Sequence, residues 1–235
     1  MGKRLVDIKK DVDNSRLLFL EYLKSNLDDD IWGLLCDLSQ YTDVYIFSGI
    51  IRNFFLKKTE FRDLDLIINK TIDVEKILKL LNIKFRLNSF GGYKLNINNI
   101  NIDLWYLEDT WALKQQGTID FELYKYIPST AFFNFSAIIY SLREKQFYCK
   151  NHFLSFLRER KINYVYKPNA NYALCIINSF YYSEKYNLKL AVKLKSYLTQ
   201  LHRKKLDYAE IQLKHFGEIL YSDEDISNKI KDLNK

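Results

Sequence analysis

Apolar residues recur at helical spacing in the first part of the chain. The segments 15–26 and 28–41 both repeat apolar positions every three to four residues, and the acidic start of the second suits a helix N-terminus. The spacing then changes. Residues 44–47 form a short apolar run that predicts a strand ending at Ser48-Gly49, and residues 50–58 predict a helix.

A second change of period divides the rest of the chain. Up to residue 107, short strand-like runs alternate with one helix, whereas from about Phe132 onward the spacing favours helices. The predicted strands are 64–68, 84–87, 93–97 and 101–107, with turns at Gly91-Gly92 and Asn98-Asn99 and a helix at 73–81. The predicted later helices are 132–145, 150–160, 170–186, 188–202 and 206–221. This order predicts an α+β protein: a head over residues 1–130 with a mixed sheet flanked by helices, then a small helical domain over residues 131–235.

Composition and charge narrow the classes of partner. The formal net charge of the 235 residues is +7, which favours acidic partners such as nucleotides or RNA and carries no information about the fold. Cys36, Cys149 and Cys175 stand far apart, as expected of free thiols in a reducing cytoplasm. The N-terminus is polar and no run of 18 apolar residues occurs, so we expect a cytoplasmic protein without a membrane partner.

The clearest chemical signal is Asp63-Leu64-Asp65-Leu66. On a strand, alternate side chains share a face, so both carboxylates point the same way while the leucines point into the core. Side by side, two like charges are costly unless cations compensate them, and paired divalent cations do so where phosphoryl chemistry occurs. Solvation of a sheet edge is the structural alternative.

A third carboxylate and a small-residue turn extend this signal. Asp103 lies between apolar residues, as Asp65 does, and it joins the same cluster if the two strands are neighbours. Three such carboxylates can hold two Mg²⁺ ions, with Mn²⁺ as the alternative ion. At the strand–helix junction, Ser48-Gly49 would let backbone amides approach a triphosphate, and Arg52 could contact its phosphates.

Taken in order, these motifs resemble a known family. The run FSGIIRNFFLKKTEFRDLDLIIN (47–69) resembles the head of the polymerase β superfamily, and most of all poly(A) polymerase and CCA-adding enzymes, which typically read GG-x-VRD-x-LL…DxDL. Residues 133–140 look like the RRD-FTINALAY segment of the same group, and residues 171–190 are similar to its helical neck. The resemblance implies that Asp63, Asp65 and Asp103 are metal ligands and catalytic residues.

Several positions depart from the family pattern. Ser48 replaces the first glycine, and Asn53 stands where an aspartate usually follows the arginine. Thr130-Ala131-Phe132 takes the place of Arg-Arg-Asp, Leu174 and Ile177 fall where the neck usually has arginines, and the base-selecting motif E-D-x-x-R is absent. These departures bear on which substrate is used, while the three carboxylates remain.

The resemblance implies transfer of a nucleoside monophosphate from an NTP such as ATP to an acceptor hydroxyl, with an RNA 3′ end such as that of tRNA as the first choice. Arg158, Arg160 and Lys161 belong to a basic run that is either an RNA-binding face or ordinary solvated surface. Two further hypotheses stay open: the same chemistry on a protein or small molecule, as in toxin, antitoxin or defence relatives, and a non-catalytic nucleotide- or RNA-binding relative.

Overall fold

The computed structural model describes residues 3–61, 63–69, 72–116, 122–168, 171–204 and 206–233. The chain divides into two compact units. We call them the head unit, residues 1–131 and 135–158, and the helical unit, residues 132–134 and 159–235. The predicted division into domains of residues 1–130 and 131–235 stays a prediction.

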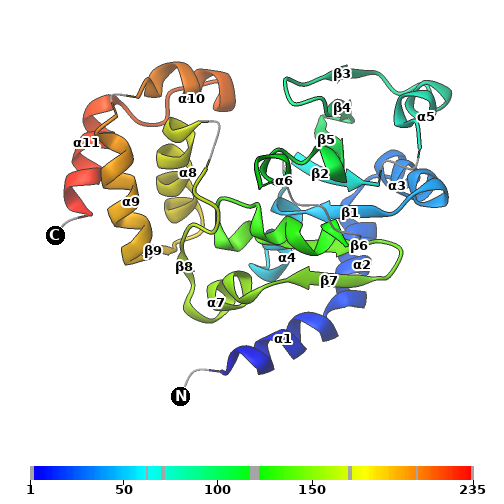
Figure 1. Cartoon of the computed structure of the whole chain (residues 1–235), viewed down its shortest axis with the longest axis horizontal. Coiled ribbons are helices and arrows are strands. Elements are labelled where there is room, and N and C mark those ends of the chain that lie inside the picture. Colours follow the sequence, from blue (N-terminus) through cyan, green and yellow to red (C-terminus); the bar gives the residue numbers. More distant parts are fainter. Residues whose placement is uncertain are drawn as a thin grey trace. The chain divides into compact units, whose positions relative to one another are not determined.

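The head unit is built on one mixed sheet of seven described strands, in the order β3-β4-β5-β2-β1-β6-β7 (Figure 1). The strands are β1 (Val44–Phe47), β2 (Asp63–Ile68), β3 (Phe85–Leu87), β4 (Tyr93–Ile97), β5 (Ile100–Tyr106), β6 (Ile138–Ser141) and β7 (Gln146–Cys149). Only β2 and β5 pair in parallel, and the other neighbours are antiparallel.

The helices of the head unit agree with the apolar spacing where the prediction addressed them. Asp28 caps α3, because its side chain accepts a hydrogen bond from the amide of Ile31 at 2.9 Å, and Asp73 caps α5 in the same way. The helices α1 and α6, by contrast, were not foreseen. The α-helices are α1 (Leu5–Asn14), α2 (Arg16–Asn26), α3 (Asp29–Tyr41), α4 (Gly49–Phe55), α5 (Val74–Leu80), α6 (Trp111–Gln116) and α7 (Asn151–Glu159). Three 3-10 helices join them: η1 (Leu107–Asp109), η2 (Leu123–Ser129) and η3 (Asn134–Ser136).

The predicted helix at 132–145 is wrong. This segment forms η3 and then β6, which pairs with the unforeseen β7 from Ile138 opposite Cys149 to Ser141 opposite Gln146. Periodicity cannot separate a short, fully buried strand from a buried helix, and all four residues of β6 are buried. The β-branched Ile138-Ile139 pair favours the strand.

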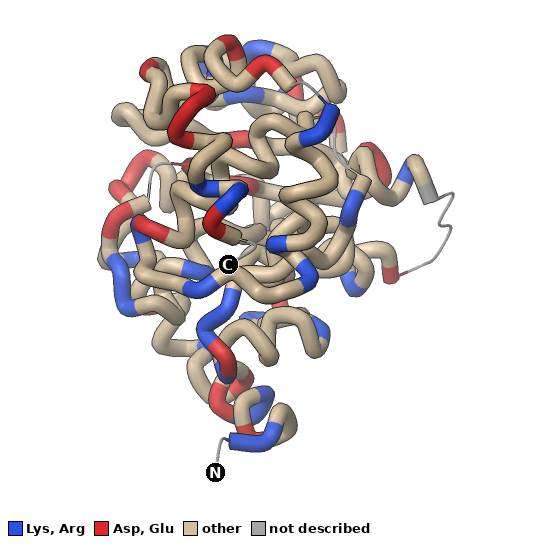
Figure 2. The backbone as a smooth tube through the Cα atoms, turned by 90° about the vertical axis from the view of Figure 1, so that its left-hand side faces the viewer, with Lys and Arg blue, Asp and Glu red and all other residues tan. Residues whose placement is uncertain are grey.

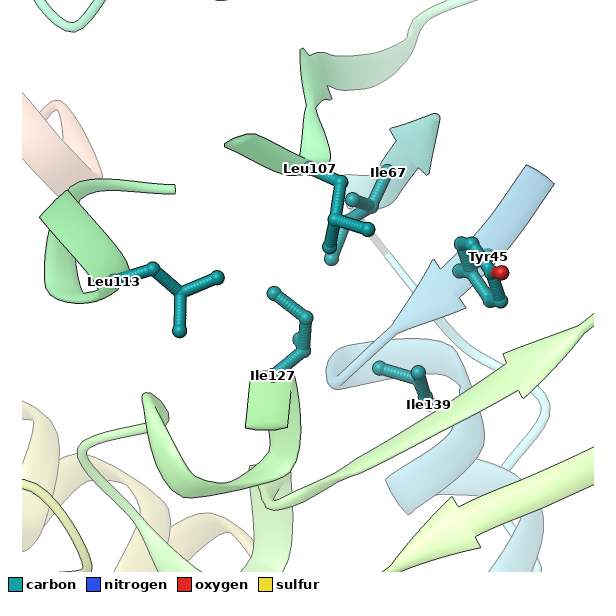
Figure 3. Packing of buried hydrophobic residues seen from close by; sticks show 6 residues of the cluster. All are labelled: Tyr45, Ile67, Leu107, Leu113, Ile127 and Ile139. Atoms are coloured by element: carbon teal, nitrogen blue, oxygen red, sulfur yellow. The ribbon is translucent and has the colours of Figure 1, made fainter. Parts of the chain in front are cut away.

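The two faces of the sheet are covered differently. On one face, Ile46, Leu66 and Tyr140 lie in register, and the Tyr140 ring contacts Phe19 of α2 at 4.8 Å between centroids. On the other face lies an apolar cluster to which β1, β2, β6, η1, α6 and η2 each contribute one side chain (Figure 3). Its members are Tyr45, Ile67, Leu107, Leu113, Ile127 and Ile139. We call this second side the acidic face, because Asp63 and Asp65 share it with Tyr45 and Ile67.

The helical unit contains the four helices drawn from yellow to red in Figure 1. They are α8 (Tyr172–Lys185), α9 (Val192–His202), α10 (Tyr208–Phe216) and α11 (Asp223–Asp232), with a short parallel pair of β8 (Lys161–Ile162) and β9 (Lys189–Leu190). The predicted helices at 170–186, 188–202 and 206–221 correspond to α8, α9 and a shorter α10, while α11 was not foreseen. Ala170, the predicted start of the first of them, lies outside the described residues. Among the described residues no helix is both long and apolar enough to cross a membrane.

Candidate active site

Strand β2 places Asp63 and Asp65 at the centre of the sheet. It lies between β5 and β1, with three strands on either side among the seven described, so the alternative that these carboxylates solvate a sheet edge is wrong. Leu64 and Leu66 are fully buried on the opposite face, whereas both aspartates are half-buried. The alternation that the sequence predicts is therefore present.

Asp103 lies directly beside Asp65 on the neighbouring strand. In the parallel pairing of β2 with β5, Asp65 is the register partner of Asp103, and Asp63 is the partner of Asn101. The Asn101 side-chain amide donates to Asp63 Oδ1 at 3.5 Å, a weak contact. All three carboxylates thus emerge on the acidic face, as expected if the two strands were neighbours.

Crowding of the carboxylates perturbs the pKa of Asp65. The pKa of this carboxyl is raised from 3.8 to about 7, first by burial and then by the negative charges of Asp103 and Asp63, against the opposing charges of Lys94 and Arg52. A carboxylate pair in such a position is stabilised by a nearby cation. A positive charge at this point of the sheet would therefore stabilise the ionised form of Asp65.

One cation is supplied by strand β4, and the motif analysis missed it. Lys94 is the register partner of Asp103 in the antiparallel β4–β5 pair, and its Nζ lies 2.9 Å from Oδ1 and donates to Oδ2 at 3.2 Å. The sequence already contained the information that pairs Lys94 with Asp103. A hairpin that turns at Asn98-Asn99 pairs Ile97 with Ile100, and counting back along both strands places Lys94 opposite Asp103.

The donor set fits a hard divalent cation, since carboxylate oxygens are the ligands that Mg²⁺ prefers. Asp103 Oδ1 is buried and, within the described part of the chain, accepts no hydrogen bond, although the Lys94 ammonium is at ion-pair distance. Across the same described residues, no three acidic, histidine or cysteine side chains are already arranged around one point that could hold a metal ion.

The Ser48-Gly49 turn lies next to the first aspartate. A Cβ built on Gly49 would meet the Asp63 carbonyl oxygen at 4.0 Å and the Arg52 guanidinium at 3.9 Å, which is ordinary contact, so the local fold does not require glycine here. Ser48, by contrast, has φ 62° and ψ −103°, a conformation that L-residues adopt only under strain. Glycine adopts such a conformation without strain, and glycine is the residue that the family pattern has at this position.

Arg52 and Asn53 are buried structural partners as well as motif residues. Arg52 Nε donates to Asn53 Oδ1 at 3.0 Å, and its guanidinium carbon lies 5.2 Å from the centroid of the Phe135 ring. The Asn53 amide in turn donates to the Glu60 carbonyl. Asn53 therefore ties α4 to the segment that leads into β2, which gives the departure from aspartate a structural role.

The basic residues predicted to contact RNA are exposed. Arg158 is in the last turn of α7, Arg160 follows that helix with φ 53°, and Lys161 begins β8. Figure 2 shows basic residues interspersed with acidic ones along the described parts of the backbone. Exposure is necessary for an RNA-binding face and equally compatible with solvated surface.

Comparison with solved structures places this arrangement in a known fold. A CCA-adding enzyme in complex with ATP matches with a TM-score of 0.65 at 15% identity, over 91% of this chain and 54% of that one. The Thermotoga maritima CCA-adding enzyme complexed with tRNA matches with a TM-score of 0.63 at 14% identity, over 91% and 53%. A tRNA nucleotidyltransferase with a primer tRNA and an incoming ATP analog matches with a TM-score of 0.58 at 16% identity, over 83% and 58%.

These matches establish the fold, over a chain that spans about half the length of the matched structures. No model of a known protein family matches the sequence, and no curated protein does. The resemblance found in the sequence is nonetheless confirmed at the level of architecture, since the matches extend well beyond the motif-bearing segment. This chain has the fold of the solved CCA-adding enzymes that it matches.

Proposed function

We propose that this protein is a divalent-metal-dependent nucleotidyltransferase that moves a nucleoside monophosphate from an NTP to an acceptor hydroxyl, most simply an RNA 3′ end such as that of tRNA. The observation that carries the proposal is the pairing of Asp65 with Asp103 at the centre of the sheet, two residues along from Asp63 on the same face. The fold supports it, because matched structures include complexes with ATP, CTP and tRNA.

In the proposed reaction, the acceptor oxygen forms a bond to the α-phosphorus of the NTP. The bond from that phosphorus to the bridging oxygen of the β-phosphate breaks, pyrophosphate leaves, and the hydroxyl proton is released. Bound Mg²⁺ or Mn²⁺ would supply charge stabilisation for the attacking and leaving oxygens. Asp63, Asp65 and Asp103 would hold it, and Asp103 is the carboxylate assigned to the side of the attacking hydroxyl.

The remaining motif residues are assigned to the substrates. Ser48 and Gly49 would leave room for the triphosphate beside Asp63, since a glycine that the local fold does not need keeps that space open. Arg52, whose charge already acts on Asp65, would add positive potential toward the phosphates. Arg158, Arg160 and Lys161 would contact the RNA backbone.

A labelling experiment tests the proposal. The protein is incubated with each α-labelled NTP, Mg²⁺ or Mn²⁺, and total cellular RNA and protein, and both the labelled product and released pyrophosphate are measured. We expect label in RNA, lost in Asp63→Ala, Asp65→Ala and Asp103→Ala variants that retain the circular dichroism of the wild type. A fully active Asp103→Ala variant would remove Asp103 from the site.

The same experiment separates the other two hypotheses. Label in protein or in a small molecule would keep the chemistry and change the acceptor. Nucleotide binding without any pyrophosphate release would instead indicate a non-catalytic relative, a reading that the loss of arginines at Thr130-Ala131-Phe132 favours.

A further inference from the structure

Strand β4 places the Lys94 ammonium group beside Asp103 of the acidic cluster. Its position opposite Asp103 follows from the antiparallel register of β4 and β5, and its Nζ lies within 3.2 Å of both oxygens of that carboxylate. The proposed chemistry gives Lys94 no part. Its contact is nonetheless with Asp103, the carboxylate that pairs in register with Asp65.

The Lys94–Asp103 ion pair is accessible to solvent. The lysine side chain is 41% exposed and the aspartate side chain 30% exposed, so water reaches the pair, although Asp103 Oδ1 is itself buried, and the ammonium can leave without opening the core. A lysine ammonium is a compact charge on a flexible four-carbon stem, which can swing away at modest cost. The oxygens that it contacts are the ones that a divalent cation at Asp103 would need.

Building on the proposed function, we propose that Lys94 is a positioning residue of this site. Its ammonium group holds the Asp103 carboxylate while no metal ion is bound, and a divalent cation displaces it from Asp103 on binding. The Lys94 ammonium contacts both oxygens of Asp103, so a metal ion that binds either oxygen competes with it for that oxygen and is repelled by its positive charge. By competing for the Asp103 oxygens, Lys94 lowers the affinity of the site for the metal ion.

Removing the ammonium should therefore strengthen metal binding. Lys94→Met keeps the aliphatic stem and loses the charge, and Lys94→Gln serves as a second uncharged variant. Lys94→Arg keeps the charge. Arg86→Met is the matched control, because Arg86 is exposed and is the register partner of Lys94 on β3, one strand farther from the carboxylates. It changes the net charge by the same amount.

The measurement is Mn²⁺ binding to the full chain, followed by electron paramagnetic resonance of free Mn²⁺ without nucleotide. Urea unfolding in EDTA checks that each variant is folded. We expect Lys94→Met and Lys94→Gln to bind Mn²⁺ about tenfold more tightly than the wild type, as for removal of one partly exposed charge beside a ligand. Lys94→Arg and Arg86→Met should stay within about twofold, since the first keeps the competing charge and the second is screened by solvent.

The outcomes separate this inference from the function on which it rests. Measurable Mn²⁺ binding with the same affinity in Lys94→Met, Lys94→Gln and the wild type would overturn the role of Lys94 and leave the proposed function standing. Equal gains in Lys94→Met and Arg86→Met would also overturn it, because net charge alone would then explain the effect. Absence of Mn²⁺ binding in every variant would overturn both.

Discussion

The charge on Asp65 should make the metal-free protein less stable as the pH rises. The folded-state pKa of Asp65 is about 7 against an ordinary 3.8, because burial and the neighbouring carboxylates favour the neutral acid. A raised carboxyl pKa means that the unfolded chain loses this proton first. The ionisation of Asp65 therefore lowers the free energy of unfolding progressively between pH 4 and pH 7, and by a constant amount above pH 7.

The size of the effect follows from the shift. Each pKa unit corresponds to about 1.4 kcal/mol, so a rise of roughly three units costs at most about 4 kcal/mol at high pH. Between pH 5 and pH 8, only the roughly two pH units below the folded-state pKa of about 7 add to this cost, and partial exposure of the side chain to solvent reduces the free energy per unit. We expect the stability advantage of Asp65→Asn over the wild type to grow by roughly 2–3 kcal/mol across this interval.

Urea unfolding in EDTA at pH 5 and pH 8 measures this difference, since EDTA removes any divalent ion that would compensate the carboxylates. Glu21→Gln is the control, because Glu21 is exposed on α2 and its loss should change the free energy of unfolding equally little at both pH values. A free-energy difference between Asp65→Asn and the wild type that is the same at pH 5 and pH 8 would refute the reasoning. So would one that shrinks as the pH rises.

Three further outcomes are expected. Ser48→Gly should raise the free energy of unfolding by about 1 kcal/mol, because glycine adopts φ 62° without strain; a loss of stability in urea would mean that the hydroxyl matters more. Gly49→Val should fold normally but raise the apparent KM for NTP, and an unchanged KM would make the turn purely structural. Replacing Arg158, Arg160 and Lys161 together by Glu should weaken RNA binding at least tenfold without altering nucleotide affinity. An RNA affinity that changes neither with salt concentration nor with this triple substitution would favour a protein or small-molecule acceptor.

Local sequence was sufficient for the elements around the carboxylates. The alternation Asp63-Leu64-Asp65-Leu66 predicts a strand with two acids on one face, and Asp28 predicts the start of α3, because side-chain period and capping act within a few residues. The order of the motifs was likewise enough for the fold, since that order resembles the pattern of a known family. These inferences needed no information about which segments meet in space.

Local sequence was not sufficient for the segment after residue 131. Ile138-Ile139-Tyr140 is apolar throughout, and only its place between β1 and β7 makes it a strand. A buried strand satisfies its backbone groups through neighbours that are distant in the chain, so the spacing of its apolar residues does not distinguish a strand from a helix.

The composition of the site was decided by tertiary structure. That Asp65 meets Asp103, 38 residues later in the printed sequence, depends on β2 pairing with β5 in a register that buries Leu64 and Leu66 beside Ile102 and Leu104. Slipping that register by one residue would turn Asp103 to the opposite face. The same pairing brings Lys94 of β4 to Asp103, and burial at the sheet centre raises the pKa of Asp65. The sequence alone could supply the carboxylates and their alternation, but their neighbours and their charge depend on strand pairing and burial, which are properties of the folded sheet.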